Sequence, residues 1–228
     1  MKAQADIISS VIIIIIAISL VSTVYMWGMP LIKKRQDATL SSRVRASFES
    51  TNFNSIQKKI EYIANNGGED TFYLDVNGIW TVYSCDSVDG GDCSCDPSAQ
   101  GLESCATENN SIQFSFFSTV SSIADDVGWV SISTTDPKEV GVSGEDSSLV
   151  WARSDSIGEG YKITYKVWFR ELVQNQTTSY KIDIIPPSST PPGIKASTDK
   201  SIKISYGGTR TLSNGKKLII TEVKLFII

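Results

Sequence analysis

The chain has 228 residues, a formal net charge of −4 and no histidine. Its acidic balance argues against a nucleic-acid partner, which usually binds a basic surface. The absence of imidazole removes the commonest general base and the commonest metal ligand. Because no nucleophile–base pair and no familiar metal-ligand spacing can be assembled from the other residues, the sequence predicts a protein that is not an enzyme and that uses no cofactor and no metal.

The N-terminal region contains a long apolar run, Ile7–Ile32, without a charged residue. About 20 apolar residues in a helix suffice to span the hydrocarbon core of a bilayer. The run is too long for the apolar region of a secretory signal peptide, and no small-residue cleavage site follows it. The sequence therefore predicts a helix that stays on the protein and is surrounded by lipid or by other apolar helices.

The residues before this run are Met1-Lys2-Ala3 and Gln4-Ala5-Asp6. A Lys-Ala pair shortly before a long apolar helix resembles the class III, prepilin-type signal of archaeal type IV pilins. The resemblance implies a leader of residues 1–3, removed by a prepilin peptidase between Ala3 and Gln4. It also implies a homopolymeric helical filament, assembled by an ATPase and a membrane platform protein. The filament-core positions expected from it are Ile7, Val11, Ile14, Ile18, Val21 and Tyr25.

The basic flank Lys33-Lys34-Arg35 follows the apolar run. The positive-inside rule taken alone would place the remainder of the chain in the cytoplasm. The cysteines and glycosylation acceptors described below favour the outside instead, and we give them more weight.

The helical pattern continues through Gln36–Ala64, with apolar residues at steps of three and four and a slip near residues 50–52. Pro30 is expected to kink or loosen the helix. Asn65-Asn66-Gly67-Gly68 predicts its end. We therefore expect one helix over residues 4–66, of which residues 7–32 form the membrane or filament-core part.

From residue 69 the period changes to that of β-strands, which predicts a head over residues 69–228. Asn77-Gly78 predicts a type I′ hairpin between strands 72–76 and 79–83. A second hairpin is expected between 162–173 and 179–185, and a third turn at Asn214-Gly215. The other expected strands are 111–117, 128–133, 148–153, 201–206 and 216–228, with a helical turn over 121–127.

The fold class is therefore α+β: a long N-terminal helix, hydrophobic and then amphipathic, followed by an antiparallel β-sandwich head of immunoglobulin-like type. Residues 185–193 form a Pro-rich linker, and residues 194–228 are expected to return to the same sandwich because they are too few for a core of their own.

All four cysteines lie in one segment, at Cys85, Cys93, Cys95 and Cys105. Zinc sites usually contain C-x2-C pairs, so two disulfides are favoured over a zinc site. The pairings 85–93 with 95–105 and 85–95 with 93–105 stay open. Asn109 and Asn175 begin Asn-X-Ser/Thr acceptors for N-glycosylation. Clustered cysteines and acceptors together indicate an oxidising exterior.

The sequence thus predicts a structural subunit of an extracellular archaeal type IV-like pilus, inserted in the cytoplasmic membrane before assembly, with its head exposed for adhesion. The alternatives are a single-helix membrane anchor that carries an extracellular binding domain without polymerising, and a minor pilin.

Overall fold

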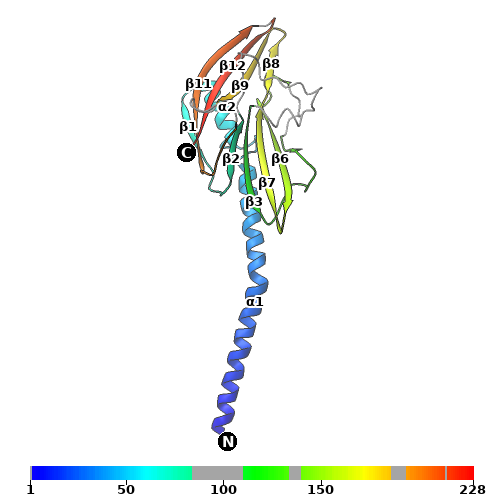
Figure 1. Cartoon of the computed structure of the whole chain (residues 1–228), viewed down its shortest axis with the longest axis vertical. Helices are drawn as coiled ribbons and strands as arrows, with labels where there is room; N and C mark the ends of the chain where they lie inside the picture. The colour runs from blue at the N-terminus through cyan, green and yellow to red at the C-terminus, as the bar shows by residue number, and fades with distance from the viewer. Residues whose placement is uncertain (1, 84–109, 134–139, 186–193, 214) are drawn as a thin grey trace.

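The computed structural model describes residues 2–83, 110–133, 140–185, 194–213 and 215–228, with side chains described from residue 11 onward and not for residues 194–197 (Figure 1). A long helix projects from one end of a β-rich head, and the N-terminus lies at the far end of this helix. The elements are α1 (Lys2–Ala46), α2 (Ile56–Asn66), β1 (Glu69–Tyr73), β2 (Ile79–Tyr83), β3 (Ser111–Ser118), β4 (Val130–Ser131), β5 (Val140–Val142), β6 (Ser148–Ile157), β7 (Gly160–Phe169), β8 (Glu171–Asn175), β9 (Thr178–Ile185), β10 (Ile194–Ser197), β11 (Ser201–Ser213) and β12 (Lys217–Ile227).

The described strands form two sheets, in the orders β1-β11-β12-β9-β8-β5 and β10-β2-β3-β7-β6-β4. Most neighbouring strands are antiparallel, but β9–β12 and β5–β8 are parallel pairs. The predicted α+β class, a long helix followed by a β-sandwich head, is confirmed. The strands after the Pro-rich linker return to the same sandwich, as expected, with β10 in one sheet and β11 and β12 in the other.

The single helix expected over residues 4–66 is instead two helices. α1 continues through Pro30 and ends at Ala46, whose carbonyl accepts a hydrogen bond from Nδ2 of Asn52 at 2.7 Å. Ser55 then caps the N-terminus of α2, where its hydroxyl accepts from the Lys58 N–H at 3.3 Å. Asn and Ser side chains compete with the helix for backbone groups, which explains the break at the slip in the apolar pattern.

The predicted hairpin at Asn77-Gly78 is wrong. β1 pairs with β11 in one sheet, whereas β2 pairs with β3 and β10 in the other. Neither Asn77 nor Gly78 has the positive φ that a type I′ turn requires. A Cβ at Gly78 would lie 2.3 Å from the Phe114 ring, so the glycine is needed where the chain passes between the sheets close to this ring.

The expected strand 162–173 also divides between the sheets. β7 ends at Phe169, β8 begins at Glu171, and the side chain of Arg170 is buried between them. Its backbone N–H donates to the Ser147 carbonyl at 3.0 Å and its Nε to the Asp146 carbonyl at 3.1 Å.

The hairpins β8–β9 and β11–β12 are confirmed. Residues 121–127 form bends and an isolated bridge rather than a helical turn. The short strands β5 and β10 were not predicted.

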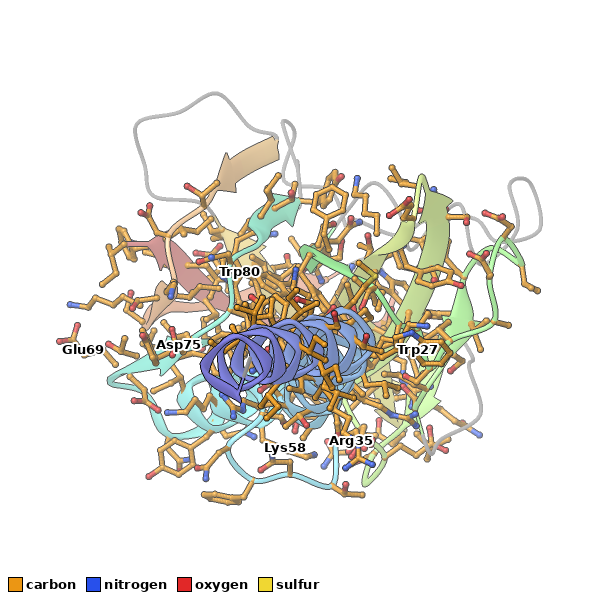
Figure 2. All side chains as sticks on the ribbon, turned by 90° about the horizontal axis from the view of Figure 1, so that it is seen from below. Trp27, Arg35, Lys58, Glu69, Asp75 and Trp80 are labelled. Atoms are coloured by element: carbon orange, nitrogen blue, oxygen red, sulfur yellow. The ribbon has the colours of Figure 1, made fainter. Side chains whose placement is uncertain are left out.

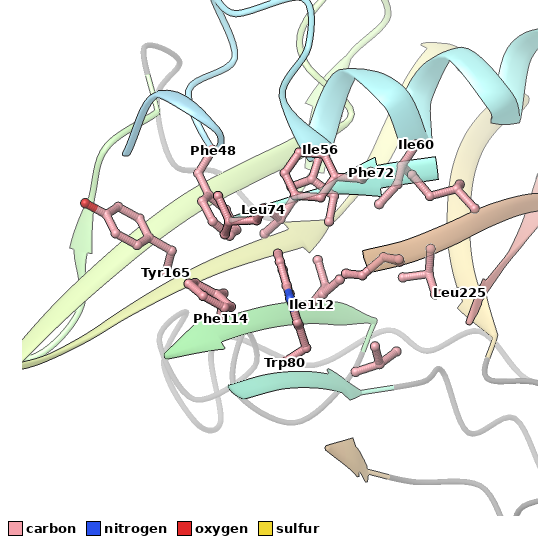
Figure 3. Close-up of a cluster of buried hydrophobic side chains, with 14 of the residues drawn as sticks. Phe48, Ile56, Ile60, Phe72, Leu74, Trp80, Ile112, Phe114, Tyr165 and Leu225 are labelled. Atoms are coloured by element: carbon pink, nitrogen blue, oxygen red, sulfur yellow. The ribbon is translucent and has the colours of Figure 1, made fainter. Parts of the chain in front are cut away.

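The core lies between the two sheets and is closed by α2 and the last turn of α1 (Figure 3). Ile56, Ile60 and Ile63 of α2 are almost fully buried, and α2 contacts β1, β11 and β12. Phe48, just after α1, stacks on Tyr165 with ring centroids 5.1 Å apart and on Trp80 at 6.0 Å. The head therefore depends on residues contributed by the long helical region, so the two are parts of one folded unit.

Candidate assembly surface

Among the described residues, the longest run of exposed apolar side chains is on α1. The segment Val11–Ala46 contains a window of mean hydropathy 2.3, none of which is buried by the described part of the chain. No charged residue lies between Asp6 and Lys33. By length and composition this helix can cross a membrane.

The apolar side chains surround α1 instead of forming one stripe. Ile12, Ile13, Ile15 and Ile16 are each at least half exposed, as are most of the expected filament-core residues. A helix that is apolar on all sides is stable only when lipid or protein covers every side. The expected filament-core residues lie on this surface with exposures of 49% for Val11, 56% for Ile14, 60% for Ile18, 68% for Val21 and 65% for Tyr25, while Ile7 is described in its backbone only.

One polar side chain within the apolar segment has its partner inside the helix. The hydroxyl of Thr23 donates to the Ser19 carbonyl at 2.8 Å. The helix likewise pairs its own backbone groups, which the hydrocarbon region requires because it offers no water. This part of α1 can therefore enter an apolar environment without leaving that hydroxyl unpaired.

The segment ends with residues that suit a membrane surface. Trp27 is 76% exposed, and Lys33, Lys34 and Arg35 follow it as three exposed cations. Figure 2, which views the molecule from below along α1, shows Trp27 and Arg35 projecting outward from the helix. Aromatic rings and then cations at the end of an apolar helix are typical of the boundary between hydrocarbon and headgroups.

The next part of α1 is attached to the head. The backbone N–H of Thr119 donates to Oδ2 of Asp37 at 3.1 Å, and the Thr119 hydroxyl donates to the same oxygen. Ser41 and Val44 are buried one and two turns later. Sequence reasoning missed the contact between Asp37 and Thr119, because only the fold brings these distant residues together.

The expected processing site lies within the described helix. Ala3 and Gln4 have helical backbone at the start of α1, and nothing further is described of their side chains. The expected disulfide residues Cys85, Cys93, Cys95 and Cys105 and the acceptor Asn109 lie outside the described residues.

The two glycosylation motifs differ in the part that the structure describes. Asn110 and Ser111, which complete the first motif, are buried, and Asn110 donates to the carbonyls of Phe169 at 3.1 Å and Ile182 at 2.7 Å. Asn175 of the second motif is exposed at the end of β8, directly before the turn to β9. The N–H and the hydroxyl of Thr177 both donate to its Oδ1 at 2.9 Å.

A hollow of about 520 Å³ lies beside α2, and its lining includes charged residues that pair with one another. Lys58 donates to Glu61 and to Asp146 at 2.8 Å each. Partial burial by itself would lower the pKa of Lys58, but these two hydrogen bonds and the charges of the carboxylates raise it above its ordinary value. The network ties α2 to the segment before β6, which is a structural role.

Among the residues that the structure describes, no group of three or more Cys, Asp or Glu side chains could hold a metal ion. A scan against protein-family models, a search of curated proteins and a search of solved structures each found no match to this chain. The exposed surface of α1 is thus the feature from which a function can be argued.

Proposed function

We propose that this chain is the structural subunit of an extracellular filament of the archaeal type IV pilus class, in which copies of α1 pack against one another. The observation that carries the proposal is a helix apolar on all sides, fixed at its other end to a folded β-sandwich. In this arrangement the helices would form the filament axis and the heads its outer surface, available for adhesion. The leader resemblance at Ala3-Gln4 supports the same function.

The energetics explain why assembly would need other components. Removing apolar surface from water stabilises a complex by about 25 cal/mol per Å². Lipid tails are as apolar as isoleucine, so moving α1 from a bilayer into a bundle gains much less. The prepilin peptidase, ATPase and platform protein implied by the resemblance are therefore part of the proposal, with the membrane as the site of the subunit before assembly.

The proposal also includes the disulfides and the glycans of the head. With the head outside the cell, the four cysteines would form two disulfides, and glycans would be attached at Asn109 and Asn175. Of the two motifs, that of Asn175 is accessible after folding, whereas attachment at Asn109 would have to precede the burial of Asn110 and Ser111.

A second candidate is a membrane-anchored extracellular binding domain that does not polymerise. The aromatic and basic residues at the end of the apolar segment favour it, because they suit a helix that remains in a bilayer. A minor pilin that starts or caps a filament is the third candidate.

Electron microscopy and mass spectrometry of material sheared from the cell surface test the proposal. We expect filaments containing this chain as the main component, with a mature N-terminus at Gln4. Ala3→Trp should block processing and filament formation, whereas Ala5→Ser should allow both. A chain that is not released by shearing and that starts at Met1 would favour the anchored domain, and a trace amount in filaments of another subunit would favour the minor pilin.

A further inference from the structure

We propose that the end of the head nearest the apolar segment of α1 is a docking surface for anionic phospholipid headgroups. We call it the basal rim and define it by Lys33, Lys34 and Arg35 of α1, Phe117 of β3, and Ile157 beside the β6–β7 turn. The inference goes beyond the proposed function and holds for a pilin or an anchored domain, because α1 is inserted in the membrane in both.

The position of the rim along α1 is the first argument. The β6–β7 turn lies beside α1 at the lower end of the head (Figure 1). Pro30, Lys33 and Lys34 line a hollow of about 460 Å³ together with Gly158 and Glu159 of this turn. Since a helix rises 1.5 Å per residue, these α1 residues lie within about one turn of Ile32, where the apolar run ends. When α1 spans a bilayer, the turn is therefore at headgroup level.

The exposed apolar residues of the rim are the second argument. Phe117 is 68% exposed and Ile157 is 50% exposed, although the other face of β3 supplies core residues. Both line a second hollow of about 320 Å³, which shares Thr119 and Glu159 with the first. Apolar side chains beside cations are the combination that binds a lipid interface, with the apolar groups entering the acyl boundary and the cations meeting phosphates.

The consecutive cations of the basal rim favour an anionic ligand. Lys33, Lys34 and Arg35 are all exposed. The carboxylates in the hollows are Asp37, which accepts hydrogen bonds from Thr119, and the exposed Glu159. Lys33 and Lys34, which line the first hollow, offset these two carboxylates, and Arg35, which lines neither hollow, leaves the basal rim with a net charge of +1. Headgroup phosphates are the anions present at this depth, so we assign the rim to lipid and not to a second copy of the chain.

Hydrogen–deuterium exchange of the full-length chain, held as single copies in nanodiscs, tests this assignment. Discs of phosphatidylcholine alone are compared with discs containing about one-third phosphatidylglycerol. We expect the amides of the β6–β7 turn to exchange more slowly in the anionic discs, and the difference to disappear at high salt, because salt screens exposed charges.

Substitutions of residues in and beside the basal rim should change the protection of these amides. Each cation near an anionic surface strengthens association about 5-fold, so K33Q/K34Q/R35Q should remove most of the protection. Glu159→Gln should increase protection, and Phe117→Ser should reduce it without unfolding the head. The matched control is K216Q/K217Q, which removes two exposed cations at the start of β12. This end of β12 lies at the end of the head away from α1 (Figure 1).

Equal exchange in neutral and anionic discs would overturn the proposal. Protection that is independent of lipid but rises with the number of copies per disc would also overturn it, by showing that a second copy covers the rim. Because filaments play no part in this experiment, its outcome is separate from that of the proposed function.

Discussion

The apolar segment of α1 and the core of the head are built from the same kinds of residue, yet their surroundings are opposite. Ile14 and Ile18 are more than half exposed, whereas Ile56 and Ile60 have no exposed surface. Every large apolar group of the head core is covered by the chain itself, whereas the described chain buries no residue in the apolar window of α1. The head, together with α2 and the end of α1, can therefore fold on the contacts of this core. The apolar segment requires lipid or other copies, so substitutions in the two regions should affect different properties.

The largest effect is expected from Phe48→Ala, at the junction of the two regions. Its ring is fully buried against Tyr165 and Trp80, and truncation of a buried Phe costs about 3–5 kcal/mol of unfolding free energy. Guanidinium unfolding of the full-length chain in detergent, followed by tryptophan fluorescence, measures the loss. Phe53→Ala is the matched control, because Phe53 is 80% exposed, and equal losses for both variants would contradict the described packing.

The next effect is expected from Ile18→Asp in the apolar segment. An acid at the centre of a spanning helix costs about 2.5–3.5 kcal/mol of insertion free energy. Membrane fractionation should show less inserted protein, while the unfolding free energy of the head should stay within about 0.5 kcal/mol of the parent. Ile18→Leu should change neither property. A head destabilised by Ile18→Asp would mean that the segment packs on the head.

A smaller effect concerns Tyr165 at alkaline pH. Burial raises the pKa of its phenol to about 12, from an ordinary value of 10.0. The unfolded chain ionises first as the pH rises, so the stability contributed by the neutral phenol is present below pH 10 and is lost between pH 10 and 12. The loss attributable to this group by pH 11 is about 1.4 kcal/mol.

Tyr165→Phe should remove that part of the alkaline loss, and unfolding curves at pH 8 and pH 11 measure it. The buried hydroxyl has no hydrogen-bond partner among the described residues, so the variant should be at least as stable as the parent at pH 8. An unchanged alkaline loss would show that Tyr165 is not buried as described.

The smallest effect is expected from Ser55→Ala, which removes the N-cap of α2. Loss of such a cap typically costs about 1 kcal/mol of unfolding free energy. Ser42→Ala, on the exposed side of α1, is the control and should be nearly neutral. If both variants were neutral, the break between the helices would not depend on this cap.

The two regions also differ in how far the sequence predicts them. The absence of charge between Asp6 and Lys33 is a local property and suffices to predict a continuous apolar helix. The break between α1 and α2 at Asn52 and Ser55 corresponds to the slip in the apolar pattern. The helix propensities of these residues did not show that two separate helices would result. Asn77-Gly78 has the local signature of a hairpin, and the approach of Phe114, which is close to it only in the fold, selects a crossing between sheets instead.

The exposed surface of α1 and the basal rim also differ in whether the sequence alone could predict them. The exposed residues of α1 follow from sequence alone, because nothing in the described chain covers them. The basal rim does not, because Phe117 and Ile157 lie in separate strands and reach Lys33 and Lys34 only through the packing of the head on α1.

Site-specific photo-crosslinking in the cells that make this protein tests the central claim most directly. A photoreactive residue at position 14, in the exposed apolar segment, should give a ladder of covalent multimers of this chain, whereas the same residue at the exposed position 53 of the head region serves as the comparison. Multimers from position 14 are the result that the account predicts. Only lipid adducts and monomers from position 14, under conditions in which the chain is abundant at the surface, would contradict it.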